Sequence, residues 1–517
     1  MTRSSREALR FSIRIIREPA FVPMTPRKQE ICRDFGIPPR ESPQTLVDGL
    51  PIELTPGTIV FVGGPSGSGK TSVLREIAER TGQYDWVGRD RNPTQRAVID
   101  TIAPRAPLST ALEILTACGL GEPRLWIRRC EDLSDGERFR AALARTVGRA
   151  ISSDRRAVII CDEFTAILHR RAARAISYNL RKLVSRHRLM LVVAATHDDV
   201  VEDLQPDRVI RLGGLCAESS DAAPRRRDIS LRRRCVVQPG SVRDYRLFGP
   251  MHYRHRDGLG FVDKVFLLRE GTGGDPLGIL VFAHAPRELT LRNRATDGRF
   301  VRNIRRLNRE LRILRRLVMH PDVRGCGLGH WFVKKTLPRV GVRFIECLAV
   351  MGAVNPVFER AGMNRIGRCP LPPGRMKLLE RMRDWNLDPF SPGFPKQIAR
   401  YPRVRRLVEQ TIMDWVSALH RASAYDAHGR PPLELTRAFR QLIGAPPIYY
   451  LWDRDRVYPR RDALPDLRGE FDSLSRPRPR RPMDDEPTAT QRNKDRSHPD
   501  GSPAPGRRPT RRGRAER

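Results

Sequence analysis

The sequence predicts an α/β protein in which a phosphate-binding domain is followed by a smaller mixed α+β domain, a helical extension and a basic tail. Three observations support this prediction. A glycine-rich loop at residues 64–71 lies between an apolar, strand-like run and a helix-like segment. A second glycine-rich turn, at residues 324–329, has the same setting in the second half of the chain. The 517 residues also exceed the ~250–300 residues at which a single hydrophobic core stops growing.

The first glycine-rich loop has the form G-x-x-x-x-G-K-[ST], which is typical of phosphate-binding loops. Glycines let consecutive backbone N–H groups turn toward an anion, and the following helix adds the positive end of its dipole. In such a loop Lys70 reaches the β- and γ-phosphates, and the Thr71 hydroxyl binds Mg²⁺. The strand before the loop and the helix after it favour this interpretation over a turn that binds nothing. The predicted phosphate-binding residues are Gly64, Pro65, Ser66, Gly67, Ser68, Gly69, Lys70, Thr71 and Ser72.

The formal net charge of +37 and the pI near 11.1 exceed what solubility requires. A field of this size attracts polyanions at long range, so nucleic acid is the leading class of partner. Genome composition raises the arginine content, but it does not by itself explain 59 acidic residues against 96 basic ones. An incidental basic surface is the alternative.

The cysteines are scattered, with no C-x-x-C pair. We expect reduced, intracellular thiols. The N-terminus lacks the continuous apolar core of a signal peptide, and no run of ~18 apolar residues occurs. The sequence therefore predicts a cytoplasmic protein without a transmembrane segment. The nine cysteines are Cys32, Cys118, Cys130, Cys161, Cys216, Cys235, Cys326, Cys347 and Cys369.

Residues 1–45 form the first predicted segment, with an edge strand at 11–16 followed by a proline-rich stretch. Beyond the phosphate loop and its helix, residues 109–120 have helical spacing. They lead to Leu133, Ser134, Asp135, Gly136 and Glu137, which open another helix-like segment.

Two apolar runs follow and end in polar residues. Residues 157–161 precede Asp162 and Glu163, and residues 189–195 precede Thr196 and His197. Taken singly, these motifs are weak, because a Ser-Asp-Gly is usually a turn and a lone histidine is more often structural. Their order and spacing along one domain carry more weight.

Together, the motifs over residues 46–215 resemble those of the ABC-type ATPases. The loop corresponds to the Walker A motif, Leu133 to Glu137 to an LSGGQ-like signature, and the run ending at Asp162 to the Walker B strand. The resemblance implies that ATP is the substrate and that Thr71 and Asp162 hold Mg²⁺. It also implies that Glu163 orients the attacking water and that His197, the switch histidine, holds the γ-phosphate.

The sequence departs from that family at two signature positions, where Asp135 replaces a glycine and Glu137 replaces a glutamine. The added negative charge near the nucleotide predicts slow turnover. The glutamine that the family places between Walker A and signature is not identifiable, and Gln95 and Asp100 both remain candidates. The family's signature closes over the Walker A nucleotide of another copy, so we expect a homodimer or a second ATPase partner.

A linker is predicted at residues 216–227, which combine small, proline and arginine residues. Apolar segments at 261–268 and 277–282 flank a Gly/Asp/Pro turn and predict an antiparallel hairpin. A further strand is predicted at 311–319, before the second glycine-rich turn and a helix.

This turn has the form R-G-x-G-x-G, and a predicted strand at 344–351 and the segment 355–363 follow it. Residues 228–370 thereby resemble the GNAT acyl-CoA N-acyltransferases. The resemblance implies that acetyl-CoA is a cofactor whose pyrophosphate is held by backbone N–H groups of the turn. The implied acyl-CoA-binding residues are Val318, Arg324, Gly325, Cys326, Gly327, Leu328, Gly329 and Asn355.

The tyrosine that often serves this family as proton donor is replaced by Phe358. The acid must then be another group, such as His320, Cys347 or water. Glu310 and Glu346 are both candidates for the base, although a plain surface carboxylate is the more common role.

The arginine-rich stretch 288–316 suits a polyanionic substrate or, equally, a solvated helix face. Residues 371–463 have helical spacing and predict a helical extension that ends in the apolar run 447–452. Residues 464–517 are rich in Arg, Pro, Ser and Asp and predict a disordered basic tail.

The order of the two domains resembles a prokaryotic family in which an ABC-type ATPase is fused to a predicted GNAT acetyltransferase. The leading hypothesis is an ATP-dependent acyltransferase that acetylates an amine on nucleic acid or on a protein bound to it. The first rival is a mechanical ATPase on nucleic acid with the GNAT domain as a coenzyme A sensor or platform. The second rival, less favoured, is the ATPase subunit of a transporter.

Overall fold

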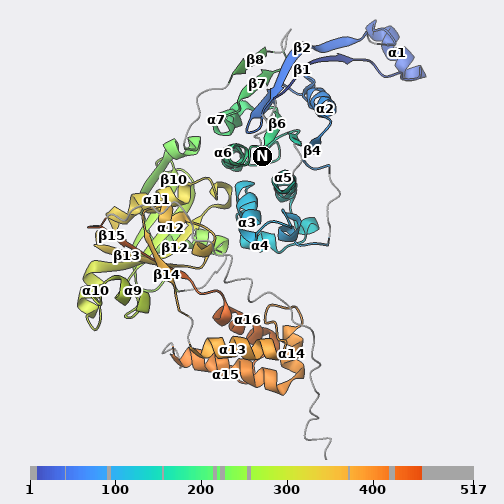
Figure 1. Cartoon of the computed structure of the whole chain (residues 1–517). Helices are drawn as coiled ribbons and strands as arrows, with labels where there is room; N and C mark the ends of the chain where they lie inside the picture. The colour runs from blue at the N-terminus through green and yellow to red at the C-terminus, as the bar shows by residue number, and fades with distance from the viewer. Residues whose placement is uncertain are drawn as a thin grey trace, which may run out of the picture. The chain divides into compact units, whose positions relative to one another are not determined.

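The computed structural model describes residues 8–40, 42–89, 95–153, 157–213, 218–221, 228–252, 258–370, 373–418 and 426–456. These residues form two compact units (Figure 1). The first contains the described residues up to 370 together with those from 445 onward, and the second contains residues 373–444. The predicted disordered tail at 464–517 lies outside the described residues.

The first unit contains a six-stranded sheet with the order β4-β5-β6-β3-β7-β8. Neighbouring strands from β4 to β7 are parallel, and β8 is antiparallel to β7. Since parallel strands end at one edge, the residues that follow β3, β5 and β6 meet there. The strands are β3 (Ile59–Gly63), β4 (Tyr84–Trp86), β5 (Val158–Cys161), β6 (Met190–Ala195), β7 (Arg208–Arg211) and β8 (Glu218–Asp221).

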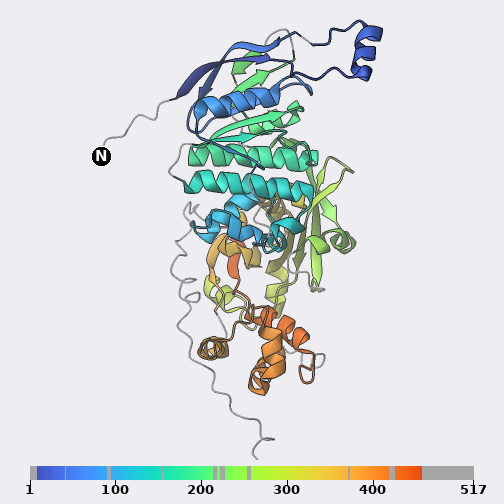
Figure 2. The ribbon, with the colours of Figure 1, turned by 90° about the vertical axis from the view of Figure 1, so that its right-hand side faces the viewer.

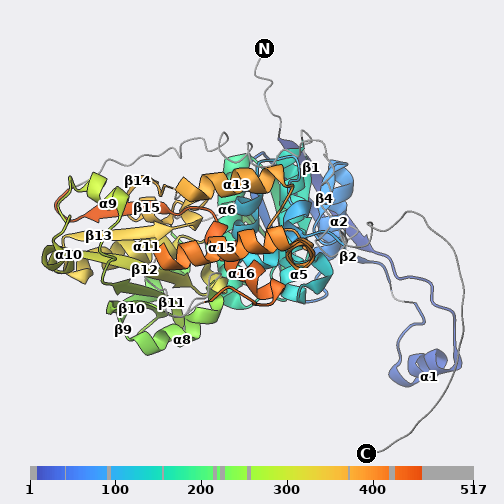
Figure 3. The ribbon, with the colours of Figure 1, turned by 90° about the horizontal axis from the view of Figure 1, so that it is seen from below.

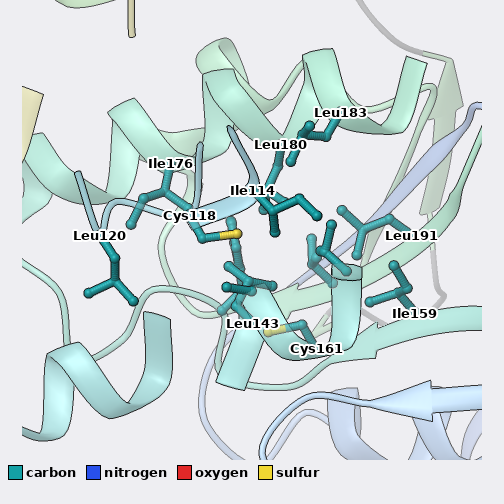
Figure 4. Close-up of a cluster of buried hydrophobic side chains, with 14 of the residues drawn as sticks. Ile114, Cys118, Leu120, Leu143, Ile159, Cys161, Ile176, Leu180, Leu183 and Leu191 are labelled. Atoms are coloured by element: carbon teal, nitrogen blue, oxygen red, sulfur yellow. The ribbon is translucent and has the colours of Figure 1, made fainter. Parts of the chain in front are cut away.

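Helices cover both faces of this sheet, because its strands are apolar on both sides. Helix α2 (Lys70–Thr81) packs on one face with Val60 and Val62 of β3. Ile59 and Phe61 point to the other face, which α3, α5 and α6 cover. Figure 4 shows this second core, and Figure 2 shows the two long helices α5 and α6 side by side. The helices of the domain are α3 (Leu108–Ala117), α4 (Pro123–Trp126), α5 (Asp135–Ser152), α6 (Arg170–His187) and α7 (Val201–Leu204).

A two-stranded antiparallel sheet precedes this core. Strand β1 (Leu9–Arg17) pairs with β2 (Gln44–Leu54), and helix α1 (Pro26–Phe35) lies between them in sequence (Figure 3). Ile13 is fully buried against the core beneath α2. The strand predicted at 11–16 is confirmed. The helix within the proline-rich stretch was not predicted, although Thr25 caps it and Pro26 is its first residue.

The second sheet has seven strands in the order β14-β15-β13-β12-β11-β10-β9 (Figure 3). All neighbours are antiparallel except β12 and β13, which are parallel. Their pairing ends at Leu314 opposite Cys347, whereas β12 continues to Met319. The two strands therefore separate beyond Leu314. The strands are β9 (Cys235–Gly240), β10 (Val262–Glu270), β11 (Pro276–Ala283), β12 (Leu311–Met319), β13 (Phe344–Ala349), β14 (Asn364–Arg368) and β15 (Ile448–Asp453).

Strand β15 corrects the assignment of residues 371–463 to one helical extension. It lies between β13 and the edge strand β14 of the second sheet, and Tyr449, Tyr450 and Leu451 are buried there. Its pairing partners in β13 and β14 lie far earlier in the chain, as Phe344 opposite Asp453 and Asn364 opposite Leu451 show, so no local pattern reports them. Similarly, part of the linker predicted at 216–227 is strand β8, while the rest of that linker lies outside the described residues.

Five short helices of the described residues belong to the second sheet, and the hairpin and central strands predicted for this region are confirmed. Its core includes Ala175 and Tyr178 of α6 next to Cys326 and Leu328. Helix α6, which covers the first sheet, therefore also packs against the apolar core of the second sheet. The helices are α8 (Tyr245–Phe248), α9 (Thr290–Ala295), α10 (Ile304–Glu310), α11 (Leu328–Thr336) and α12 (Val357–Arg360).

The second unit is helical, as the spacing over residues 376–443 predicts. Its core brings together Phe394, Val408, Ile412 and Phe439, among others. None of the helices in the described residues is long and apolar enough to cross a membrane. The helices are α13 (Pro373–Asp384), α14 (Phe394–Arg400), α15 (Pro402–Ala418) and α16 (Pro432–Ile443).

Candidate functional site

The phosphate loop connects β3 to α2 at the edge of the first sheet where the parallel strands end. Gly67 and Gly69 have φ of 80° and 91°, which glycine adopts without strain. Gly64 has φ of 154°, and a Cβ there would lie 2.5 Å from the carbonyl oxygen of Leu212. A side chain at Gly64 would therefore displace the backbone of the loop or of the segment after β7.

Lys70 and Ser68 show how the loop could accept an anion. The Lys70 ammonium donates hydrogen bonds to the carbonyl oxygens of Gly64 (2.8 Å) and Pro65 (2.6 Å), so it lies across the loop. The Ser68 Oγ is buried and has no hydrogen-bond partner in the described part of the chain. A bound phosphate would offer acceptor oxygens to both groups. These residues fit the triphosphate of a nucleotide.

Thr71 and Asp162 meet directly across the sheet edge. The Thr71 Oγ1 donates to Asp162 Oδ2 over 2.7 Å, and Asp162 Oδ1 accepts from the Glu163 backbone N–H at 3.0 Å. A hydroxyl and a carboxylate in contact are the oxygen ligands that Mg²⁺ prefers. The pair brought together here is the one predicted from sequence for the metal.

Glu163 and His197 are both exposed and follow β5 and β6 at the same sheet edge. Glu163 has φ of 48°, and nearby Thr165 has φ of 62°. Such conformations cost a residue with a side chain about 1–3 kcal/mol, and they tend to occur at functional sites. His197 precedes the 3₁₀ turn Asp198–Val200, and its side chain makes no capping hydrogen bond there.

Residues 54–202 match the AAA domain family. The aliphatic sulfonates import ATP-binding protein SsuB 2 of Mesorhizobium japonicum is 29% identical over 227 residues, covering 40% of this chain and 86% of that protein. A solved dimeric bacterial ABC transporter cassette is 21% identical with a TM-score of 0.27, covering 33% of this chain and 88% of that chain. A probable anion import ATP-binding protein of Haloferax volcanii is 30% identical over 218 residues, covering 34% of this chain and 74% of that protein.

This chain belongs to the ABC-type ATPases. Membership rests on the first domain, which is an ATP-binding ABC ATPase cassette and is called the ATPase domain below. The match to the AAA family ends at residue 202, before the first strand of the second sheet, so it does not include that sheet.

The signature of the ATPase domain lies at the N-terminus of α5. Ser134 is the N-cap, and its backbone N–H donates to Glu137 Oε2 over 2.9 Å in a capping box. Glu137 thus has a structural role that glutamine can also fill. Arg138 forms an ion pair with Asp135 and donates to the Leu133 carbonyl oxygen at 2.6 Å. This partner offsets the negative charge that Asp135 adds.

The missing glutamine of the ATPase domain stays unassigned. Gln95 follows residues 90–94, which lie outside the described part of the chain, and Asp100 lies in the 3₁₀ turn Val98–Thr101. Both residues are exposed. Both therefore remain candidates.

The second glycine-rich turn connects β12 to α11. Gly325 and Gly327 have φ of 80° and 91°, and Gly327 is the N-cap of α11. Arg324 is held by the carbonyl oxygens of Met319 (3.0 Å) and Met251 (2.8 Å). The turn therefore presents backbone N–H groups at the positive end of a helix, which suits a phosphate.

The remaining residues predicted to bind acyl-CoA are not all at this turn. Cys326 and Leu328 are buried, and burial raises the pKa of the Cys326 thiol to about 11. Gly329 lies at the start of α11. Val318 is buried on the other face, in a cluster with Tyr245 and Phe248. Asn355 is exposed in the loop before α12.

The ATPase domain contacts this turn closely. A Cβ at Gly325 would lie 2.9 Å from Thr116 Cγ2 of α3 and 3.0 Å from the Thr116 carbonyl oxygen. Arg171 of α6 forms ion pairs with Glu270 and Asp275, each at 2.6 Å. The sequence predicts the two phosphate sites in separate domains, but helices α3 and α6 of the ATPase domain contact the second sheet around its glycine-rich turn.

Both candidate bases are engaged by arginine. Glu346 is fully buried and accepts from Arg292 at 2.6 and 2.9 Å, and from the Tyr449 hydroxyl at 3.0 Å. Burial raises the pKa of Glu310, but the hydrogen bond and charge of Arg299 and neighbouring arginines outweigh it and lower that pKa. Neither carboxylate is free to accept a substrate proton. Arg292 and Arg299, in the arginine-rich stretch, thus have structural partners.

The candidate acids are also engaged or buried. His320 Nδ1 accepts from the Asp322 backbone N–H at 3.3 Å, and burial lowers the pKa of His320. Burial raises the pKa of Cys347. Phe358 is buried with its ring 5.3 Å from the Tyr450 ring, whose hydroxyl donates to Glu359 Oε1 at 2.9 Å.

The sequence did not point to two further residues of the second sheet, Tyr450 and His284. Tyr450 supplies a phenol beside Phe358, and it was overlooked because β15 was assigned to the helical extension. His284 follows β11 and lines a cavity of about 1490 Å³ together with Tyr245, Arg287 and Arg315. Its Nδ1 is buried and has no hydrogen-bond partner among the described residues.

Proposed function

We propose that this chain hydrolyses ATP in its first domain and carries an acyl-CoA-dependent N-acyltransferase in its second. The proposal of an acyltransferase rests on the strand order of the seven-stranded sheet. Its one parallel pair, β12 and β13, stops pairing midway along β12. Such a gap lets a pantetheine arm pass between β12 and β13, directly before the glycine-rich turn. This arrangement is the one expected from the resemblance to GNAT enzymes.

In the proposed ATPase chemistry, Lys70 leaves the carbonyl oxygens of its loop to contact the β- and γ-phosphates. Thr71 and Asp162 hold Mg²⁺, which supplies charge neutralisation when bound. Glu163 orients and polarises the attacking water, and His197 holds the γ-phosphate. The capped N-terminus of α5 binds the nucleotide of a second copy, because each chain has one Walker A loop and one signature.

In the proposed acyl transfer, backbone N–H groups from Gly325 to Gly329 hold the diphosphate of acetyl-CoA. The acceptor amine attacks the thioester carbonyl carbon, the new C–N bond forms, and the C–S bond breaks. The thiolate takes a proton, which we assign to the Tyr450 hydroxyl: its ring packs against Phe358, and it would have to exchange its present hydrogen bond to Glu359 for one to the thiolate. His284 is the candidate to accept the amine proton, since its Nδ1 lacks a partner in the described structure.

The acceptor is proposed to be an amine on nucleic acid or on a protein bound to it. Two observations support this class. The chain carries a formal charge of +37, and arginines line the cavity beside His284. A polyanion would be attracted to such a surface.

A mechanical ATPase on nucleic acid, with the second domain as coenzyme A sensor or platform, is the second candidate. The engagement of Glu310 and Glu346 by arginines, and the loss of tyrosine at Phe358, favour it. The transporter alternative draws on relatives named for import of sulfonates and anions. Those relatives match 40% or less of this chain, so they do not address the second sheet.

The experiment is acyl transfer by the full chain. Purified protein is incubated with carbon-labelled acetyl-CoA, ATP and Mg²⁺, together with total RNA, DNA or protein from cells that lack the gene. We expect label in one of the three acceptor fractions, and much less with Tyr450→Phe. Labelling of none of them, with ATP hydrolysis intact and acetyl-CoA bound, would favour the sensor or platform alternative. Co-purification with a membrane protein would favour the transporter.

A further inference from the structure

Helix α6 of the ATPase domain lies against the start of α11. Ala175 and Tyr178 of α6 belong to the same buried cluster as Cys326 and Leu328. The α6 side chains in the next turn therefore face the glycine-rich turn. Asn179 and Lys182 are the polar residues among them.

Asn179 is a buried residue whose amide N–H group has no partner in the described part of the chain. It is 4% exposed, and its Nδ2 has no hydrogen-bond partner among the described residues. The Nδ2 lies 3.3 Å from the position that a Cβ on Gly325 would occupy. A buried N–H donor left unpaired is destabilising, so it is expected to have a ligand in some state of the protein.

Positive charges gather at the first turn of α11. Lys182 Nζ lies 3.8 Å above the ring of Tyr178, and the Arg232 guanidinium lies 5.4 Å from the ring of Trp331. Burial, together with the charges of Arg360, Lys182 and Arg232, lowers the pKa of His330 to about 4. Asp228 is the opposing carboxylate there, and it forms an ion pair with Arg232.

We propose that Asn179 and Lys182 of the ATPase domain complete the anion site at the start of α11, so that both domains hold the diphosphate of acetyl-CoA. This inference rests on the proposed function. The amide and ammonium add donors to the backbone N–H groups of the turn, and the helix dipole favours the same charge. A diphosphate has enough acceptor oxygens to satisfy donors from two sides.

The consequence is coupling between the two ligands. Helix α6 begins seven residues after Glu163, so a shift of this segment with the nucleotide would move Asn179 and Lys182. By linkage, ATP would change the affinity for acetyl-CoA, and acetyl-CoA would change the affinity for ATP by the same factor.

The experiment is calorimetric titration of the full chain with acetyl-CoA and, separately, with pantetheine, which lacks the diphosphate. Lys182→Ala is the test variant because Lys182 as a whole is exposed and does not belong to the apolar core, although its ammonium packs over the Tyr178 ring and burial there lowers the pKa of Lys182 to about 8. Lys335→Ala, exposed in the last turn of α11, is the matched control. We expect Lys182→Ala to weaken acetyl-CoA binding about tenfold, as loss of a hydrogen bond to a charged group does. Pantetheine binding and the control should not change.

Lys182→Glu, a charge reversal at the same exposed position, should weaken acetyl-CoA binding further. If the wild type binds acetyl-CoA and both Lys182 variants bind it equally well, the joint site is wrong while the proposed acyl-CoA domain stands. If the wild type binds no acetyl-CoA, the proposed function is wrong and the joint site falls with it. In a Lys70→Ala background, ADP binding as tight as that of acetyl-CoA, with the same dependence on Lys182, would make the ligand a nucleotide and overturn the assignment.

Discussion

Single substitutions of Lys70 and Glu163 should distinguish nucleotide binding from nucleotide hydrolysis. Lys70→Ala removes the ammonium that would contact the phosphates, so both ATP binding and hydrolysis should be lost. Glu163→Gln removes the carboxylate that positions water but keeps the nucleotide, so hydrolysis should fall at least ~100-fold with binding retained. Phosphate release and nucleotide titration measure the two effects.

Glu79→Gln, exposed on α2, is the matched control and should hydrolyse ATP like the wild type. Because the nucleotide stays bound, Glu163→Gln should also accumulate as an ATP-bound dimer in light scattering. A monomer at saturating ATP and Mg²⁺ would argue against the opposed-dimer arrangement.

The buried pair Arg292–Glu346 makes a prediction about stability. Both side chains are fully buried, so Arg292→Ala would leave an unpaired carboxylate inside the second sheet. We expect the free energy of unfolding to fall by about 3–5 kcal/mol. Urea unfolding followed by circular dichroism measures it. Arg294→Ala, exposed on the same helix, should cost no more than about 0.5 kcal/mol, and an equal effect of the two variants would contradict the structural role given to Arg292.

At the scale of helices and strands, local signals were sufficient for most of the ATPase domain. The phosphate loop, the polar residues after β5 and the capped start of α5 are all encoded by neighbouring residues. The meeting of Thr71 with Asp162 follows from parallel strands ending at one edge. The capping box of Ser134 and Glu137 also has a local signal, the S-x-x-E spacing, so Glu137 is a helix-capping residue as well as a departure from the family's signature.

Long-range pairing explains what the sequence did not reveal. Strand β15 joins the second sheet after the intervening helices α13 to α16, and its apolar run looked like the end of those helices. Tyr450 was missed as a result. The arginine partner of Glu346 comes from a distant part of the chain, in α9, so that carboxylate looked available. The partners of Glu310, by contrast, are the nearby Arg299, Arg306 and Arg309. The contact of α6 with the second glycine-rich turn has no sequence signal at all.

Removing β15 should disrupt the second sheet. A chain that ends after Gly444 would leave the edges of β13 and β14 unpaired, which favours aggregation. We expect it to be insoluble or to elute as aggregates in size-exclusion chromatography, whereas a chain that ends after Arg456 should elute as the wild type does. Soluble, cooperatively unfolding protein from the shorter chain would mean that β15 is dispensable.

For the whole molecule, the net charge of +37 predicts binding to nucleic acid that weakens steeply with salt. Each phosphate neutralised on duplex DNA contributes a slope of about −0.9 in log K against log salt concentration. If six or more are contacted, affinity should drop at least ~10³-fold between ~50 and ~200 mM salt. Fluorescence anisotropy with labelled DNA and RNA measures this. A chain lacking the residues from 464 onward tests the tail, and an unchanged slope would assign binding to the remaining residues.

We propose that an ABC-type ATPase domain and an acyl-CoA domain are joined in one chain, and titration with acetyl-CoA tests whether they are. Wild type and Gly327→Val are titrated by calorimetry, with ATP hydrolysis measured in parallel. Valine rarely adopts the φ of 91° found at this position, and its side chain would occupy the space through which the diphosphate contacts the backbone. The variant should therefore lose acetyl-CoA binding and keep ATP hydrolysis. Absence of heat and of protection from thermal unfolding with the wild type at millimolar acetyl-CoA would contradict the claim.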